Sequence, residues 1–268
     1  MSPSFDHVYL SPHLDDAVFS CGGTILRQRA RGERVLVITV CAGVPAEDAL
    51  PPPLLADGLR AVGATAADFV RHRRKEDRIA MEMLGVEWEW RDEADAPFRL
   101  AAHYGTLAGL LGPVAPDDPL VPRCRELARS IAPGAMLHAP LAVGGHVDHR
   151  IVCEAALAAR RPISLYEDFP YGAHDPTGVD RRLAELSDLG LVEEAVAVAD
   201  VLARRIEASL AYASQVASPD DWRDLVLSHA IRIGTGVGVP VERSFRVAPR
   251  PGPDGNPPDA QPATGSTP

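Results

Sequence analysis

Short apolar runs alternate along the chain with longer amphipathic segments. Arg34–Cys41 is rich in β-branched residues and has the composition of a buried strand. Similar runs predict strands at Val8–Leu10, Val86–Arg91, Met136–Ala139, Ile163–Glu167 and Val241–Val247. Helical patterns predict helices at Ala17–Ala30, Ala66–Leu84, Pro119–Ile131, Val147–Ala159, Asp180–Leu189, Ala195–Val216 and Asp221–Ile231. The pattern therefore predicts strands that alternate with helices over most of the chain.

This alternation predicts parallel βαβ units and an α/β fold with three layers. In such folds ligands bind beyond the carboxyl ends of the strands. The loops that follow the predicted strands are therefore the expected functional edge. The proline-rich, acidic segment Val44–Gly58 is expected to be one such loop. No internal repeat divides the chain, so a single domain is expected.

Composition and charge narrow the class of protein. The chain has 268 residues, 46% of them apolar and 24% charged, which fits one large globular domain. Its net charge of −10 disfavours a nucleic-acid partner. The chain shows neither a secretory leader nor an apolar run of the ~18 residues that span a bilayer, so a cytoplasmic protein without a membrane partner is expected. None of these patterns encodes an oligomeric state.

The last residues differ in composition from the rest. Residues 249–268 are rich in proline and glycine and have few large apolar side chains. Such a segment buries too little surface to offset its ordering entropy. We therefore expect one domain over residues 1–248 and a disordered tail over residues 249–268.

Two segments combine imidazole and carboxylate side chains at strand ends. Ser11–Asp16 (SPHLDD) follows the first predicted strand, and Gly144–His149 (GGHVDH) follows a later one. Zinc prefers nitrogen and oxygen ligands in tetrahedral geometry, and a catalytic zinc site keeps one position for water. Two histidines and one carboxylate from these segments would satisfy that requirement.

The spacing within each segment suggests how the roles divide. His13 and Asp16 are three residues apart, so one helical turn or tight loop can direct both inward. A metal-activated water needs a base, and the neighbouring Asp15 suits that role without being a ligand. In the second segment, a carboxylate near an imidazole favours its charged form. A cationic His146 paired with Asp148 is expected to stabilise the oxyanion and protonate the leaving amine.

These segments resemble the motifs of a known family. YLSPHLDDAVFSCGG is similar to the first motif of the PIG-L/LmbE-like deacetylases, written (A/S)HPDDE or SPHxDD, and GGHVDHRIV is similar to their second motif, HxDH. The resemblance extends from Val8 to Arg246 through RHRRKEDRIAMEMLGV, DAPFR, YEDFPY and VERSF. It implies a Rossmann-like fold with a mostly parallel sheet and one divalent metal ion, usually zinc. It also implies hydrolysis of N-acyl groups, often from N-acetylglucosamine derivatives.

The resemblance also implies roles for single residues. The family's metal ligands correspond to His13, Asp16 and His149. Asp15 matches its general base, and His146 matches the histidine that stabilises the oxyanion or acts as general acid. Asp148 matches the carboxylate that tunes that histidine.

Two further residues resemble the family's substrate contacts. Arg73, in an R-x-x-E pattern, is similar to an arginine that binds polar groups of the substrate, and Asp95 in DAPFR is similar to a substrate-binding aspartate. Asp92 competes with Asp95 for that position. Leu14 stands where many members have proline and Ala17 where many have glutamate, which bears on the subgroup and not on the ligands.

The predicted function is a zinc-dependent N-deacetylase that acts on an amino sugar or a sugar-bearing natural product. The alternative is an amidase that cleaves a larger amide, such as a mycothiol S-conjugate, with the same metal chemistry. A non-catalytic binding protein and another hydrolase, such as an esterase, are further alternatives. An intact Asp15, His146 and Asp148 argue against the binding protein, because a degraded enzyme commonly loses its base.

Overall fold

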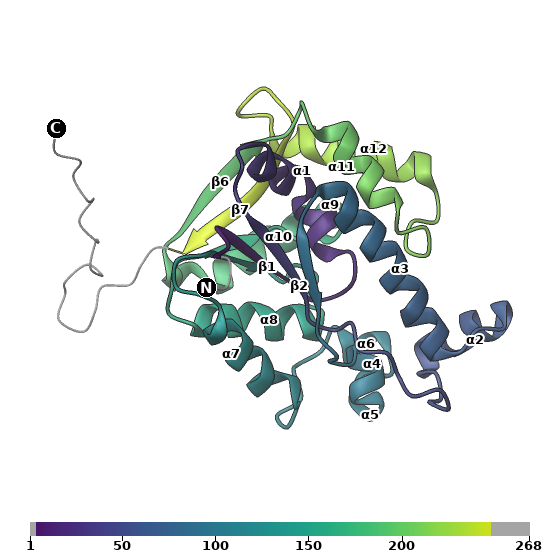
Figure 1. Ribbon diagram of the computed structural model, residues 1–268. Coiled ribbons are helices and arrows are strands. Elements are labelled where there is room, and N and C mark those ends of the chain that lie inside the picture. Colours follow the sequence, from purple (N-terminus) through teal and green to yellow (C-terminus); the bar gives the residue numbers. More distant parts are fainter. Residues whose placement is uncertain (1–3, 248–268) are drawn as a thin grey trace, which may run out of the picture.

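The computed structural model describes residues 4–247 (Figure 1). The predicted tail, residues 249–268, lies outside the described residues. The described residues form one sheet of seven strands in the order β3-β2-β1-β4-β5-β7-β6. The parallel strands are β1 (His7–Ser11), β2 (Val35–Thr39), β3 (Glu87–Trp90), β4 (Met136–Pro140) and β5 (Ile163–Tyr166). β7 (Val241–Val247) pairs antiparallel with β5, and β6 (Leu191–Ala197) pairs antiparallel with β7.

Helices cover both faces of the sheet, which gives the expected three layers (Figure 1). One layer contains α7 (Leu120–Ser130), α8 (Val147–Ala158) and α10 (Pro176–Glu185). The other contains α1 (Asp16–Ala30), α3 (Ala66–Leu84), α11 (Leu202–Leu210) and α12 (Pro219–Ile233). Side chains of β1 alternate between the layers: Val8 and Leu10 pack toward α8, and Tyr9 packs toward α1. The single α/β domain with a mostly parallel sheet is therefore confirmed.

The short helices lie mainly in the connections at the carboxyl edge of the sheet. They are α2 (Pro53–Val62), α4 (Ala96–Arg99), α5 (Ala101–Tyr104), α6 (Leu107–Leu110), α9 (Tyr171–His174) and the 3-10 turn η1 (Ser187–Leu189). The prediction that Val44–Gly58 is a loop is wrong at its end, because α2 begins at Pro53 with proline in its first turn. Among the described helices, none is long and apolar enough to cross a membrane.

Near the C-terminal end, one element prediction was wrong and another was wrong in its bounds. Ala195–Val216 was predicted to be one helix, but the structure has strand β6 up to Ala197 and then helix α11. The alanines and glutamates of β6 favour a helix locally, and pairing with β7 along all seven residues overrides that preference. The helix predicted at Asp180–Leu189 begins earlier, at Pro176, where Asp175 accepts a capping hydrogen bond from the Gly178 N–H group.

Candidate active site

The topology brings the two motifs together. β1 and β4 are parallel neighbours, so the loops that leave their carboxyl ends meet at one edge of the sheet. The first loop is held by Ser11, whose hydroxyl donates to the His13 carbonyl at 2.7 Å and accepts from the Ala17 N–H group at 3.1 Å. The second motif runs into the start of α8, with His146 as the cap residue. Both motifs thus sit on the ends of buried elements.

His13, Asp16 and His149 form a group that could hold a metal ion. Each offers a ligand atom, and these atoms lie within 4.8 Å of one another. The Asp16 Oδ2 atom is 3.2 Å from His13 Nδ1 and 3.3 Å from His149 Nε2. Tetrahedral zinc with ligands at about 2.0–2.2 Å separates its ligand atoms by about 3.3–3.6 Å. All three residues are buried, so the group is preorganised at nearly that spacing.

One buried nitrogen atom of this group lacks a hydrogen-bond partner among the described residues. His149 Nε2 is buried and has no hydrogen bond among the described residues. A buried polar atom without a partner costs free energy, and such atoms are rare unless a ligand or water completes them. A divalent ion between His13, Asp16 and His149 would supply that partner. The residues present therefore fit a metal.

The Asp148 carboxylate contacts His13, whereas the sequence predicted that it pairs with His146. Its Oδ2 atom lies 3.1 Å from His13 Nε2 and accepts from the Ala96 N–H group at 3.0 Å, while Oδ1 accepts from Arg99 Nη2 at 2.6 Å. Burial opposes the charged form of Asp148, and the partners His13 and Arg99 overcome it, so that its pKa lies well below the usual range. The carboxylate is turned toward His13 because that imidazole and the Arg99 guanidinium are its nearest donors.

The protonation state of His146 differs from the cationic form that we expected from the sequence. Burial, reinforced by the nearby His13, lowers the pKa of His146 to about 4. Its Nδ1 atom accepts the Asp148 N–H group at 3.2 Å. A neutral ring that accepts at Nδ1 carries its proton on Nε2. The structure thus favours a neutral His146 with one donor, because burial penalises the charged ring.

Asp15 lies beside the metal group and is not part of it. It is 7% exposed, and its φ angle of 129° is one that side-chain-bearing residues rarely adopt. Burial raises the pKa of Asp15 to about 7, although the Arg73 guanidinium, 3.0 Å from its Oδ2 atom, lowers it. A carboxyl group with a pKa near neutrality suits a general base.

The two predicted substrate residues have different surroundings. Arg73 is nearly buried, and its Nη2 atom donates to the Leu14 carbonyl at 2.7 Å and to Asp15. Asp95 precedes α4 with its side chain 25% exposed, and its Oδ1 atom lies 3.5 Å from His13 Nε2 without a hydrogen bond. The competing Asp92 lies on the surface, paired with Arg74. Asp95 is therefore the aspartate at the site, and Arg73 directly contacts Asp15.

Two residues at the site, the buried Asp168 and Arg99 with its nearly buried side chain, were missed in the sequence. Asp168, in YEDFPY, contacts His149 Nδ1 at 2.6 Å. Arg99, in DAPFR, joins Asp148 to Asp118, to which it donates two hydrogen bonds of 2.8 and 2.9 Å. In the sequence, Asp168 is marked only by its position just after a strand, and Arg99 only by its place in the DAPFR segment. Neither position reveals which side chain the residue contacts.

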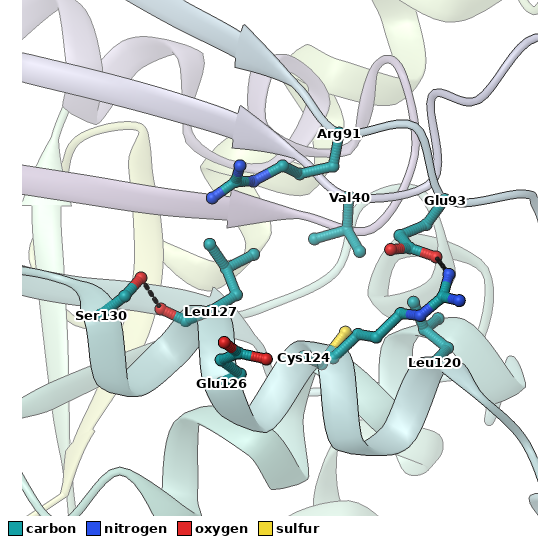
Figure 2. Close-up of a pocket in the computed structure, with 9 residues that line it drawn as sticks. Val40, Arg91, Glu93, Leu120, Cys124, Glu126, Leu127 and Ser130 are labelled. Atoms are coloured by element: carbon teal, nitrogen blue, oxygen red, sulfur yellow. Dashed lines mark hydrogen bonds and ion pairs between the residues drawn. The ribbon is translucent and has the colours of Figure 1, made fainter.

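A cavity of about 360 Å³ lies away from these residues (Figure 2). It opens between the ends of β2 and β3 and helix α7, over Val40 and Leu127. Among its charged lining residues, Arg123 contacts Glu93 at 2.5 Å, and Arg91 contacts Glu89 at 2.9 Å. No predicted site residue lines this cavity.

Known proteins resemble the chain along most of its length. It is 33% identical over 233 residues to 2'-N-acetylparomamine deacetylase of Streptomyces fradiae, a match that covers 83% of this chain and 77% of that protein. The crystal structure of the A40926 pseudoaglycone deacetylase Dbv21 superposes with a TM-score of 0.72 and 26% identity, covering 92% of this chain and 98% of that one. The zinc-inhibited form of teicoplanin deacetylase Orf2 gives a TM-score of 0.71 and 25% identity, covering 90% and 97%.

The fold and these relatives define the class of enzyme: the chain is a deacetylase, a hydrolase that acts on amides. More narrowly, it belongs to the PIG-L family, described as GlcNAc-PI de-N-acetylase, whose model matches residues 8–160. The matched region includes both motifs together with Arg73 and Asp95. The resemblance read from the sequence is thereby confirmed.

Proposed function

We propose that this enzyme removes the acetyl group from the nitrogen of an amino sugar within a small glycosylated molecule. A single divalent ion, zinc, would be held by His13, Asp16 and His149. The observation that carries the proposal is the buried three-residue ligand group with Asp15 beside it. The substrate class is supported by relatives that are named for acetylated paromamine and for teicoplanin.

The metal would supply a concentrated positive charge that polarises the amide carbonyl and makes water more acidic. The chain's own task is to keep three ligands in place around that charge. His13 and His149 present neutral nitrogens, and Asp16 presents a carboxylate that balances part of the charge. Because all three are buried, little reordering is needed when the ion binds.

Asp15 would accept the proton of the attacking water. It must be ionised to do so, and burial has moved its pKa close to neutrality. Once protonated, it can deliver that proton to the leaving amine, so one residue serves both halves of the reaction. Arg73 would hold the carboxylate in place through its contact of 3.0 Å.

His146 would stabilise the charge that develops on the carbonyl oxygen. A neutral ring with its proton on Nε2 can donate one hydrogen bond to that oxygen without bearing a charge itself. The ring lies against His13, with their centroids 4.8 Å apart, so the donor belongs to the same site. Asp95, whose side chain is 25% exposed, would accept a hydrogen bond from a sugar hydroxyl or amide group.

The test is a substrate panel for the zinc-loaded protein. The panel contains N-acetylated aminoglycoside fragments, N-acetylglucosaminides with different aglycones, and N-acyl sugars with longer acyl chains. Free amine and the released acid are both quantified, and a chelator-treated sample is the control. Equal amounts of amine and acetate from an acetylated sugar would support the proposal. Cleavage only of the longer amides would favour an amidase, and no amine from any compound would contradict the proposal.

A further inference from the structure

Asp168 lies directly behind His149, on the side away from the metal group. Its Oδ1 atom is 2.6 Å from His149 Nδ1. The His149 ring has its other nitrogen, Nε2, near Asp16 and without a hydrogen bond of its own. Nδ1 of His149 thus contacts the Asp168 carboxylate, and Nε2 faces the ligand group.

The Asp168 carboxylate is fixed at both oxygens. Oδ2 accepts the N–H group of Val143, in the loop that leads into the second motif, at 3.0 Å. The Asp168 carbonyl accepts the Gly172 N–H group at 2.8 Å, which ties the residue to the start of α9. The residue is 1% exposed, so water does not compete for these contacts.

We infer that Asp168 is a positioning residue of the metal centre, one that sets the tautomer and orientation of His149. An ionised carboxylate only accepts hydrogen bonds, so His149 must carry its proton on Nδ1. In the neutral ring that binds a metal ion, Nε2 is then the nitrogen with the free lone pair that a metal ligand requires. This inference rests on the metal ligands of the proposed function.

A matching arrangement serves the other histidine ligand. Asp148 contacts His13 at Nε2, and the opposite nitrogen, Nδ1, faces Asp16. Each histidine therefore has a buried carboxylate behind the nitrogen that faces away from the ligand group, but the two carboxylates come from different elements. Asp168 is the cleaner one to test, because it has no contact with His146 or Arg99 among the described residues.

Asp168→Asn is the informative substitution. The Val143 N–H group needs an acceptor, so the amide oxygen of the asparagine should turn to it and the amide NH₂ group should face His149. His149 would then accept at Nδ1 and carry its proton on Nε2, the nitrogen meant for the metal. Loss of such a supporting partner weakens metal affinity by about 10- to 100-fold.

The experiment measures zinc affinity of the metal-free full-length protein by competition with a chromophoric chelator. Glu167→Gln is the matched control, because Glu167 is the adjacent buried carboxylate but pairs with Arg243, at 2.6 Å, and not with a ligand. The His149 tautomer is read separately from ring nitrogen shifts, and circular dichroism confirms folding. We expect weaker zinc binding and proton transfer to Nε2 in Asp168→Asn, and unchanged affinity in Glu167→Gln.

The outcomes separate this inference from the proposed function. Wild-type zinc affinity in a folded Asp168→Asn protein, or an equal loss in Glu167→Gln, would overturn the role of Asp168 alone. If Asp168→Asn does not fold, Asp168→Glu provides the second test, since it restores the charge, and it should recover Nδ1 protonation of His149. Failure of the wild-type protein to bind zinc would instead contradict the metal centre itself.

Discussion

Burial and pairing of charges decide the chemistry at the scale of single residues. Asp15, Asp16, Asp148 and Asp168 all lie within a buried region, where an isolated carboxylate would tend to become protonated. Asp16 and Asp148 contact imidazoles, and their pKa values are lowered despite burial. Asp15 keeps a raised pKa, because its one arginine partner does not offset burial. The structure thereby gives Asp15 a pKa near neutrality, which suits a general base, whereas the pKa values of Asp16 and Asp148 are lowered.

The first prediction at this scale concerns pH. Asp15 must lose its proton before it can act as base, so activity should rise as pH increases through its pKa. That pKa is about 7 in this structure, and a bound cation would lower it, so the acidic limb should lie at or below about pH 7. The measurement is the pH dependence of kcat for the zinc-loaded enzyme, with Asp92→Asn, an exposed carboxylate, as control. Activity that falls with rising pH from 4 to 7 would contradict the role of Asp15.

The second prediction concerns Arg73. Because its guanidinium contacts Asp15, Arg73→Ala should lower kcat by about 10-fold or more, the scale of a misplaced acid–base group. A residue that only bound substrate would mainly raise KM. Steady-state kinetics decide between the two. Arg71→Ala is the control, since Arg71 pairs with Glu47 and Asp68 on the surface. A rise in KM with unchanged kcat would return Arg73 to its family role as a substrate contact.

The motif residues could be found from the sequence, whereas their partners could not. His13, Asp16 and His149 were singled out by type, by position after predicted strands and by the resemblance to the family motifs, and the structure brings them within reach of one ion. The contacts of Asp148 with His13, and of Asp168 with His149, depend on rotamers and on residues far apart in the chain. Such pairings produce no periodic pattern that a single sequence could show.

At the scale of elements, regular periodicity identified the buried helices and strands. Ala66–Leu84 was predicted with the observed bounds of α3, where Thr65 and Asp68 form a capping box at the start and Gly85 ends the helix in a left-handed conformation. β6 was missed, because its composition favours a helix and only its neighbour β7 makes it a strand. The local preference of a segment for helix or strand therefore predicted the observed element only where tertiary packing favoured the same element.

Helix α1 carries the first motif, and one glycine in it is required by packing. A Cβ atom at Gly23 would lie 2.8 Å from Glu242 Oε1 and 2.8 Å from Val198 Cγ1. Glu242 is itself fixed, because it accepts from the Gly23 and Thr24 N–H groups and pairs with Arg205 at 2.7 Å. The helix can therefore approach this ion pair closely only with glycine at position 23.

Gly23→Ala should lower the free energy of unfolding by about 1–3 kcal/mol through overpacking. Gly58→Ala, in α2 where nothing lies within 4 Å of the added carbon, should instead raise it by about 0.5–1 kcal/mol through helix propensity. Urea denaturation of both variants is the measurement. Equal effects of the two substitutions would show that the close contact at Gly23 is relieved at no cost.

At the scale of the whole molecule, the parallel order of β1 and β4 creates the site. Residues more than 130 positions apart, such as His13 and Asp148, meet because both follow strands that end at one edge. The ion would therefore link the two motifs, and its binding should stabilise the folded chain. A ligand at 100 times its dissociation constant adds about 2.7 kcal/mol to the free energy of unfolding.

Zinc should accordingly raise the Tm of the metal-free protein, and the rise should grow with free zinc concentration. His149→Ala should remove most of this dependence, because it deletes a ligand with no other hydrogen-bonding role at Nε2. His174→Ala, a histidine on α9 outside the ligand group, is the control. Calorimetry with buffered zinc is the measurement. An undiminished shift in His149→Ala would place the ion elsewhere.

In the proposed mechanism, Asp15 works as the base next to a metal ion that other residues hold. Asp15→Asn keeps the size of the side chain and removes its basicity. At equal zinc content, measured in the same samples, the variant should release acetate from an accepted N-acetyl sugar at least about 10²-fold more slowly than the wild type. Wild-type turnover at equal zinc content would contradict the account, and so would loss of zinc from the variant, since Asp15 would then be a ligand.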